Sequence, residues 1–169
     1  MELSKKDRII LYNQYEILKR LDPDDAEIYA KDQAILLHGF EYNYDDIGSS
    51  FDEIPCSVSK KVHDILRMFR CMTSSFDRLE DTAGLNRNDY MFRGFDMTDE
   101  PEYYTYAEWL ITYGKYSEFK DCEFNSHWHI LPRYEKMLER FKEVTKGKDD
   151  SIDIIDLSIN ELNYIIDKK

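Results

Sequence analysis

The pattern of apolar positions is strongest between residues 55 and 81, where it has the spacing of a long helix. Apolar side chains in this stretch recur at intervals of three and four residues and share one helix face: Val58, Val62, Ile65, Leu66, Phe69, Met72 and Phe76. Pro55 suits the first turn, and no proline or glycine follows before Gly84. His63 falls on the opposite, polar side. The sequence therefore predicts a central helix of about 40 Å along which other segments pack.

The N-terminal pattern predicts two helices joined by a short turn. Ser4 can cap the first helix, which runs to about residue 20 and carries one continuous stripe on a helical wheel: Ile10, Leu11, Tyr15, Ile17, Leu18 and Leu21. Gln14 lies within that stripe. Asp22 and Pro23 predict a stop and a restart, with the aspartate as cap and the proline at the first position of the second helix. Gly39 suits the end of that helix, so the pair should form an antiparallel hairpin.

Three further helices are expected downstream, over 99–113, 132–146 and from Ser158 onward. Asp99 with Glu102, and Ser158 with Glu161, have the spacing of capping boxes. Residues 90–95 resemble a short strand and 151–156 alternate in part, so the two could pair as a small two-stranded β ribbon. The predicted fold class is all-α, a mostly helical bundle with that one ribbon, built as a single domain over 1–169.

The helix expected at 99–113 carries an unusually wide aromatic surface. Its large side chains cover more than half of the helical wheel, with Tyr103, Tyr106, Trp109 and Tyr113 prominent among them. A helix that is apolar over so much of its surface must be covered on two sides. Two interpretations stay open: a second subunit covers one side, since tyrosine and tryptophan favour interfaces, or both sides lie in the core.

Charge argues against one class of partner. The chain has 23 Lys and Arg against 35 Asp and Glu, a net charge of −12, and its basic residues are scattered along the sequence without a patch. Phosphate backbones require clustered cations, and an acidic surface repels anionic membranes. We therefore expect no direct nucleic-acid partner and no membrane partner. No apolar run is long enough to span a bilayer.

Localisation is predicted from the N-terminus and the cysteines. The first eight residues lead into an amphipathic helix and lack the apolar core of a signal peptide. Cys56, Cys71 and Cys122 are odd in number and widely spaced, as expected of reduced thiols in the cytoplasm. A reactive thiol at Cys122 would need an electropositive setting, which Asp121 and Glu123 oppose.

Several motifs carry a resemblance to a known family. Residues 8–15 read Arg-Ile-Ile-Leu-Tyr-Asn-Gln-Tyr and are followed by Leu-Asp-Pro at 21–23. The chain resembles the YfbU family, whose members open in this way, and the resemblance continues in order through Tyr29, Gly94 to Asp96, Tyr116, Phe119, Phe124, Asn125, Tyr134 and Glu161. That family has no established enzymatic activity, so it supplies no catalytic residues. Some members carry the domain beside a helix-turn-helix module, which implies a ligand-sensing or regulatory role.

The family motif at the N-terminus supplies the candidate ligand site. An amide such as Gln14 on an apolar helix face needs hydrogen-bond partners, or it destabilises the fold by about 1–3 kcal/mol. Three interpretations stay open for Gln14: it holds a neighbouring loop or helix end, it anchors a ligand in a mostly apolar pocket, or it lies in a subunit interface. The candidate ligand-binding residues are Arg8, Asn13, Gln14 and Tyr15.

The remaining chemistry is sparse. His127 and His129, at i and i+2, form the only cluster with metal-ligand character, whereas a metal site needs three or four ligands in fixed geometry. Solvated histidines beside Trp128 are the simpler interpretation, and we expect no metal, no cofactor and no catalytic residues. The leading hypothesis is a non-catalytic regulatory, ligand-sensing or protein-interaction domain that forms a homo-oligomer. The alternative is a small metal-assisted hydrolase that uses His127 and His129.

Overall fold

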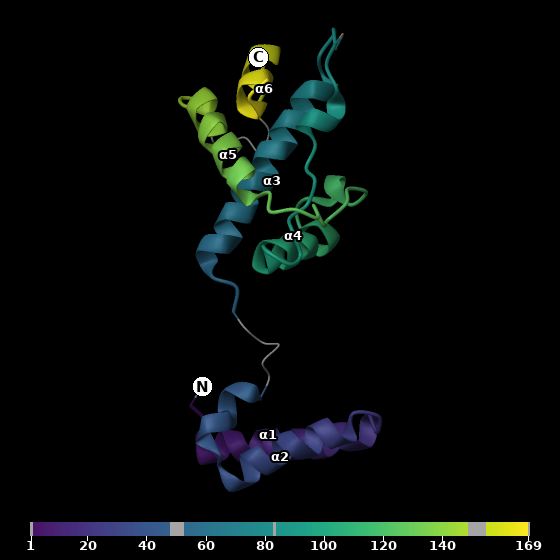
Figure 1. Ribbon diagram of the computed structural model, residues 1–169, viewed down its shortest axis with the longest axis vertical. Coiled ribbons are helices and arrows are strands. Elements are labelled where there is room, and N and C mark those ends of the chain that lie inside the picture. Colours follow the sequence, from purple (N-terminus) through teal and green to yellow (C-terminus); the bar gives the residue numbers. More distant parts are fainter. Residues whose placement is uncertain (1, 48–52, 83, 149–154, 169) are drawn as a thin grey trace. The chain divides into compact units, whose positions relative to one another are not determined.

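The computed structural model describes residues 2–47, 53–82, 84–148 and 155–168. Its contacts divide the chain into two compact units, Met1–Glu53 and Ile54–Lys169, and each is described by itself. Among the described residues the regular structure is helical, which confirms the predicted all-α class (Figure 1). The prediction of one domain over 1–169 stays a prediction.

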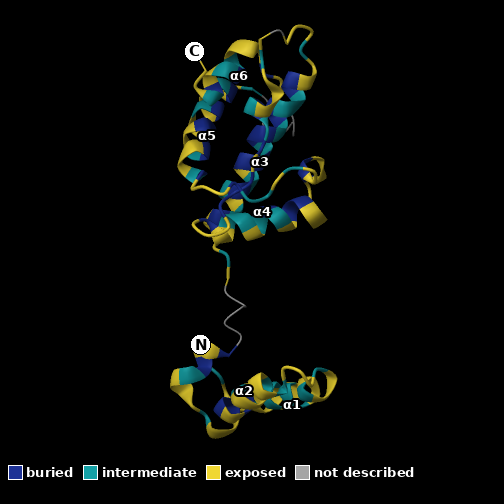
Figure 2. Ribbon diagram, turned by 45° about the vertical axis from the view of Figure 1, so that its right-hand side comes forward, coloured by how far each residue is buried: buried dark blue, intermediate teal, exposed yellow. Residues whose placement is uncertain are grey.

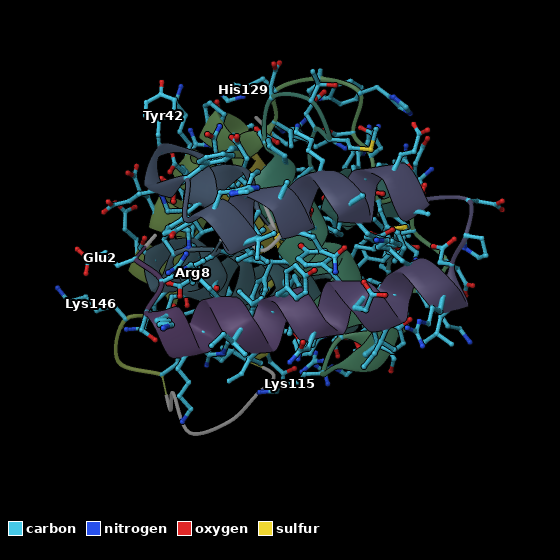
Figure 3. The ribbon with its side chains drawn as sticks, turned by 90° about the horizontal axis from the view of Figure 1, so that it is seen from below. Glu2, Arg8, Tyr42, Lys115, His129 and Lys146 are labelled. Atoms are coloured by element: carbon cyan, nitrogen blue, oxygen red, sulfur yellow. The ribbon has the colours of Figure 1, made fainter. Side chains whose placement is uncertain are left out.

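The first unit is the predicted helical hairpin followed by a short 3-10 helix. Helices α1 (Lys5–Leu21) and α2 (Ala26–His38) lie side by side, and η1 (Glu41–Asp46) follows them (Figures 1 and 3). Ser4 caps α1 as predicted, because its hydroxyl accepts from the Asp7 amide while the Asp7 carboxylate accepts from the Ser4 amide. Gly39 ends α2 with φ of 68°.

The predicted start of the second helix was wrong by three residues. Helix α2 begins at Ala26 with Asp25 as its N-cap, because residues 22–25 form a turn before the helix. Asp22 does not cap it and instead accepts a hydrogen bond from the Tyr29 hydroxyl at 3.1 Å. Asp22 is the C-cap of α1, where its amide donates to the Leu18 carbonyl oxygen.

The second unit is built on α3 (Cys56–Asp77), which matches the predicted central helix. It also contains η2 (Arg87–Tyr90), α4 (Pro101–Tyr113), η3 (Ser117–Phe119), α5 (Leu131–Thr145) and α6 (Ile159–Ile166). Helices α4, α5 and α6 and the turn η2 all contact α3. The buried side of α3 follows the predicted stripe, and Figure 2 shows it facing the other helices.

An aromatic cluster fills the core between α3 and α5. Rings of Phe69, Phe92, Phe95 and Tyr134 lie with centroids 5.0 to 5.9 Å apart, mostly edge to face. Each of these side chains is at most 2% exposed. Edge-to-face pairs add about 0.5–1.5 kcal/mol each beyond the burial of their area, so the cluster is a major source of stability.

The capping boxes and the ribbon predicted for the second unit had different outcomes. The Asp99 and Glu102 capping box is wrong: α4 begins at Pro101 with Glu100 as N-cap, and no side chain caps it. The strand partner proposed at 151–156 falls mostly outside the described residues. Phe95 forms an isolated parallel bridge with Asn125. The second predicted capping box, Ser158 with Glu161 at α6, is confirmed.

Gly94 permits the crossing of two loops beside this bridge. Its φ is 76°, and a Cβ there would lie 2.0 Å from the Phe124 carbonyl oxygen. The close approach lets the Phe95 amide donate to the Phe124 carbonyl oxygen at 3.0 Å, while the Ser126 amide donates to the Phe95 carbonyl oxygen at 3.1 Å. Glycine is needed here both for its backbone conformation and for its lack of a side chain.

We expect Gly94→Ala to lower the free energy of unfolding by more than about 2 kcal/mol, because the new methyl group collides with backbone that cannot yield. Gly84→Ala is the matched control: Gly84 has φ of 79°, but a Cβ added there would have nothing within 4 Å, so it should lose only about 1–2 kcal/mol. Urea denaturation followed by circular dichroism measures both. Equal losses would contradict the crossing-loop interpretation.

Candidate functional site

The four candidate ligand residues of α1 divide between two sides of the helix. Arg8 reaches toward α2 and donates from Nη1 to the Leu36 carbonyl oxygen at 3.1 Å (Figure 3). Tyr15 also faces α2, with its ring 6.0 Å from that of Tyr29. Asn13 and Gln14 are exposed and lie away from that contact. Within the first unit, then, the structure brings Arg8 and Tyr15 to the α2 side but not Asn13 and Gln14.

Arg8 lines two shallow hollows of the first unit. One encloses about 240 Å³ against Tyr12 and Leu36, and the other about 740 Å³ beside Ser4 and Tyr44. Neither hollow is lined by Tyr15, Asn13 or Gln14. Burial, followed by a hydrogen bond with Asp32, raises the pKa of Tyr15 to about 12, so its hydroxyl stays protonated at neutral pH.

The buried amide of the hairpin is Gln33, which the sequence reasoning missed. It is 5% exposed. Its Nε2 donates to the Tyr12 carbonyl oxygen and to the Glu16 carboxylate, both at 3.1 Å, and its Oε1 accepts from Lys19 Nζ at 3.0 Å. The sequence did contain a signal for this burial. Gln33 follows Tyr29 by four residues, which places both side chains on the same face of the helix.

Most of the α1 stripe is left uncovered within the first unit. Helix α1 has no buried residue, and four apolar side chains of its stripe are 39% to 76% exposed: Ile10, Ile17, Leu18 and Leu21. Packing against α2 covers only one edge of the stripe, at Leu11 and Tyr15, which are half-buried. An apolar surface of this kind is typical of a contact site.

The aromatic helix α4 combines a buried face with an exposed edge. Ala107, Leu110 and Ile111 are buried, and Tyr103 and Tyr106 pack partly against the core. Trp109 is 53% exposed and Tyr113 is 79% exposed. The Tyr106 and Trp109 rings stack with centroids 6.0 Å apart. Of the four candidate interface residues, Tyr103 and Tyr106 are half-buried, whereas Trp109 and Tyr113 are exposed.

His63 is not on a solvated face, contrary to the sequence-based expectation. Its Nε2 lies 3.3 Å from the Tyr106 hydroxyl, and its Nδ1 lies 3.4 Å from the Tyr116 hydroxyl. Burial lowers the pKa of His63 below its ordinary value of 6.5, and Lys115 lowers it further, while Asp64 opposes the shift. The two tyrosines come from outside α3, so the sequence could not reveal them as partners.

The two candidate metal ligands point to different carboxylates. His127 Nε2 lies 3.2 Å from Glu123 Oε1, and His129 Nδ1 lies 3.2 Å from Glu100 Oε1. Within the ranges that the structure describes, no three His, Cys, Asp or Glu side chains gather as a metal site would require. Nothing in these residues supports the hydrolase alternative.

Glu100 has a structural role that the sequence did not indicate. Its side chain is 1% exposed. One carboxylate oxygen accepts from the Leu131 amide at 2.6 Å, and the other accepts from the Asp96 amide at 2.9 Å. The carboxylate therefore caps the first turn of α5 and also holds the turn before α4. Both positions are helix N-termini, which favour negative charge. Asp96, in turn, accepts from the amides of Thr98 and Asp99.

Comparison with known proteins gives two findings. The family model described as the YfbU domain matches residues 1–168. A protein of Actinobacillus succinogenes described as "UPF0304 protein" is 31% identical over 163 residues, which cover 95% of this chain and 99% of that protein. Both matches extend over the two compact units. In addition, no helix among the described residues is long and apolar enough to cross a membrane.

We expect Gln33→Ala to destabilise the hairpin by about 1–3 kcal/mol, because the substitution removes the hydrogen bonds of a buried amide to the Tyr12 carbonyl oxygen, Glu16 and Lys19. Hydrogen exchange of peptides from 5–38 should become faster. Gln14→Ala, which removes an exposed amide from the same hairpin, is the control and should stay within about 0.5 kcal/mol. If the two variants exchange alike, Gln33 is not the amide that holds the hairpin together.

We expect the second unit to lose stability on acidification through His63. The unfolded chain binds a proton near the ordinary pKa, whereas the folded chain binds it only at lower pH, so the free energy of unfolding falls as pH drops below about 6.5. His63→Gln should make the loss between about pH 7.5 and 5.5 smaller. Urea denaturation at the two pH values measures this, and an unchanged loss would show that His63 is not involved.

Proposed function

This chain belongs to the YfbU family, and we propose that it is a non-catalytic domain that acts through protein contacts and associates with copies of itself. A regulatory or ligand-sensing role and a cytoplasmic location belong to the same proposal. So does ligand binding at Arg8, Asn13, Gln14 and Tyr15. A ligand that touched all four residues would have to contact α1 from two sides.

The observation that carries the proposal is the exposed edge of α4. Trp109 and Tyr113 are four residues apart, so they project from the same helix face, and Tyr106 stacks against Trp109 from one turn earlier. Large aromatic side chains of this kind are the usual anchors of protein interfaces. A second copy of the chain is the partner that we propose for this edge, since most soluble oligomers are symmetric homo-oligomers.

The uncovered stripe of α1 is a second supporting observation. Isolated apolar side chains on a surface need no explanation, whereas a continuous apolar stripe along a helix usually packs against another chain or segment. Among its described residues, the first unit has few buried apolar side chains, namely Ile35, Leu36, Tyr44 and Ile47. A unit of that size gains stability from association, which agrees with self-association of the whole chain.

We expect Trp109→Ala to lower the molar mass of the oligomer, because loss of an interface anchor weakens association by about 2 kcal/mol or more. Light scattering coupled to size exclusion measures the mass, which should shift toward the 20.3 kDa of a single chain. Trp109 is a cleaner probe than Tyr106, whose hydroxyl also contacts His63.

Trp128→Ala is the matched control for this experiment. Trp128 is 51% exposed, close to the value for Trp109, but it lies in the loop before α5. Its replacement should leave the mass unchanged. A wild-type protein that already has the mass of one chain, or two variants that both keep the wild-type mass, would reject the α4 edge as the site of self-association.

A further inference from the structure

The fold gathers three arginines that are scattered in the sequence around one hollow of the second unit. Arg70 extends from α3, Arg78 is the residue that caps its C-terminus, and Arg87 comes from η2; the hollow that they line encloses about 560 Å³. We call this site the arginine hollow. Ser74 and the Cys122 thiol also line it. A volume of this size is within the usual range for small-molecule sites.

Helix geometry explains why α3 and its C-cap residue supply two of the three guanidinium groups. Arg70, Ser74 and Arg78 are spaced by four residues and therefore lie along one strip of the helix surface. Arg78 is exposed on this strip, Ser74 is half-buried, and the Arg70 side chain is 13% exposed. Arg87 adds the third guanidinium group because η2 contacts α3.

Carboxylates hold two of the guanidinium groups in place. Asp77 accepts from Arg87 Nε at 2.7 Å and from Nη2 at 2.8 Å, and Arg87 Nη1 lies 3.2 Å from the Met91 sulfur, a weak acceptor. Arg70 Nε donates to Glu118 at 2.5 Å, and the guanidinium lies 4.3 Å from the Tyr116 ring centroid. Arg70 Nη2 also donates to the Lys115 carbonyl oxygen. Pairing of this kind orients a guanidinium group.

These ion pairs do not exclude an incoming anion. The side chains of Arg87 and Asp77 are 45% and 50% exposed, and those of Arg78 and its partner Asp156 are 51% and 82% exposed. Exposed pairs of this type contribute little to stability, whereas planar guanidinium groups bind phosphate oxygens in a bidentate manner. Asp77 and Glu118 line the hollow and Asp156 pairs with Arg78, so each of the three arginines has one carboxylate partner.

We propose that the arginine hollow binds a phosphorylated small molecule, with Arg78 and Arg87 contacting its phosphate oxygens, Arg70 adding positive charge from the wall, and Ser74 donating from its hydroxyl group. A long nucleic acid fits less well, since the acidic surface around the hollow would repel a backbone that carries many charges. This site shares no residue with the α4 edge or with α1. It therefore does not depend on the self-association proposed above.

The alkylation rate of the Cys122 thiol reports whether a ligand occupies the arginine hollow. Cys122 is half-buried in the wall of the hollow, and burial followed by the nearby Asp121 raises the pKa of its thiol. Cys56 is exposed at the start of α3 and does not line the hollow, so it serves as an internal reference in the same molecule. Alkylation by neutral iodoacetamide at mildly alkaline pH, followed by peptide mass spectrometry, gives both rates.

The test uses pyrophosphate as the probe with the full chain, at ionic strength held constant with sodium chloride so that screening does not change. We expect alkylation of Cys122 to slow about tenfold at a probe concentration of about ten times the Kd, while Cys56 reacts at its original rate. Arg87→Gln should abolish this protection. Arg133→Gln, which removes an exposed arginine of α5 that does not line the hollow, should retain it.

Three results would overturn the proposal. Cys122 could react at an unchanged rate with pyrophosphate at about 1 mM, which would show that the hollow has no useful affinity for phosphate oxygens. Protection of equal size in Arg87→Gln would place pyrophosphate elsewhere. Equal slowing of alkylation at Cys56 would show that pyrophosphate slows the iodoacetamide reaction in general. Arg78→Gln, whose partner Asp156 is largely exposed, is a second variant that should retain the fold and lose protection.

Discussion

The burial of α3 is the constraint on which the rest of the second unit depends. Many of its side chains are fully buried, among them Val62, Ile65, Leu66 and Met72. A helix can be buried to this extent only if other elements cover several sides of it, and α4, α5, α6 and η2 all contact it. The strip that stays more exposed carries Arg70, Ser74 and Arg78. The same helix therefore supplies both the core and one wall of the arginine hollow.

The loops that connect these helices are fixed by buried polar groups and by one close backbone crossing. Glu100 satisfies amide groups at the turn before α4 and at the first turn of α5, and Gly94 lets the chain pass against Phe124. A buried carboxylate is stable only when donors surround it, so Glu100 ties two distant loops into one arrangement. His129 contacts the same carboxylate, which gives this histidine a structural partner.

The first unit has a different energetic character. Its helices are held by the Gln33 amide and by a small apolar cluster, and the stripe of α1 remains exposed within the unit. Because burial of apolar surface is the main driving force for folding, a unit with so little of it depends more on hydrogen bonds and on association. This difference agrees with the proposal that the protein acts through contacts with other chains.

The sequence by itself determined the helices and most of their ends. Apolar side chains at spacings of three and four residues identified α1, α3 and α5, and local hydrogen bonds fixed the caps at Ser4 and Ser158. These features depend on residues that are near each other along the chain, so a linear pattern contains them. The family resemblance could also be read directly from the motif at residues 8–15.

Only the tertiary structure decided which polar side chains meet. Gln33, and not Gln14, became the buried amide, because packing against α2 covers one side of α1 and leaves the other exposed. His63 received two tyrosine partners from other segments, and Arg87 joined Arg70 across many residues of chain. Contacts of this kind depend on how helices are oriented toward one another, and periodicity within a single helix carries no information about that orientation.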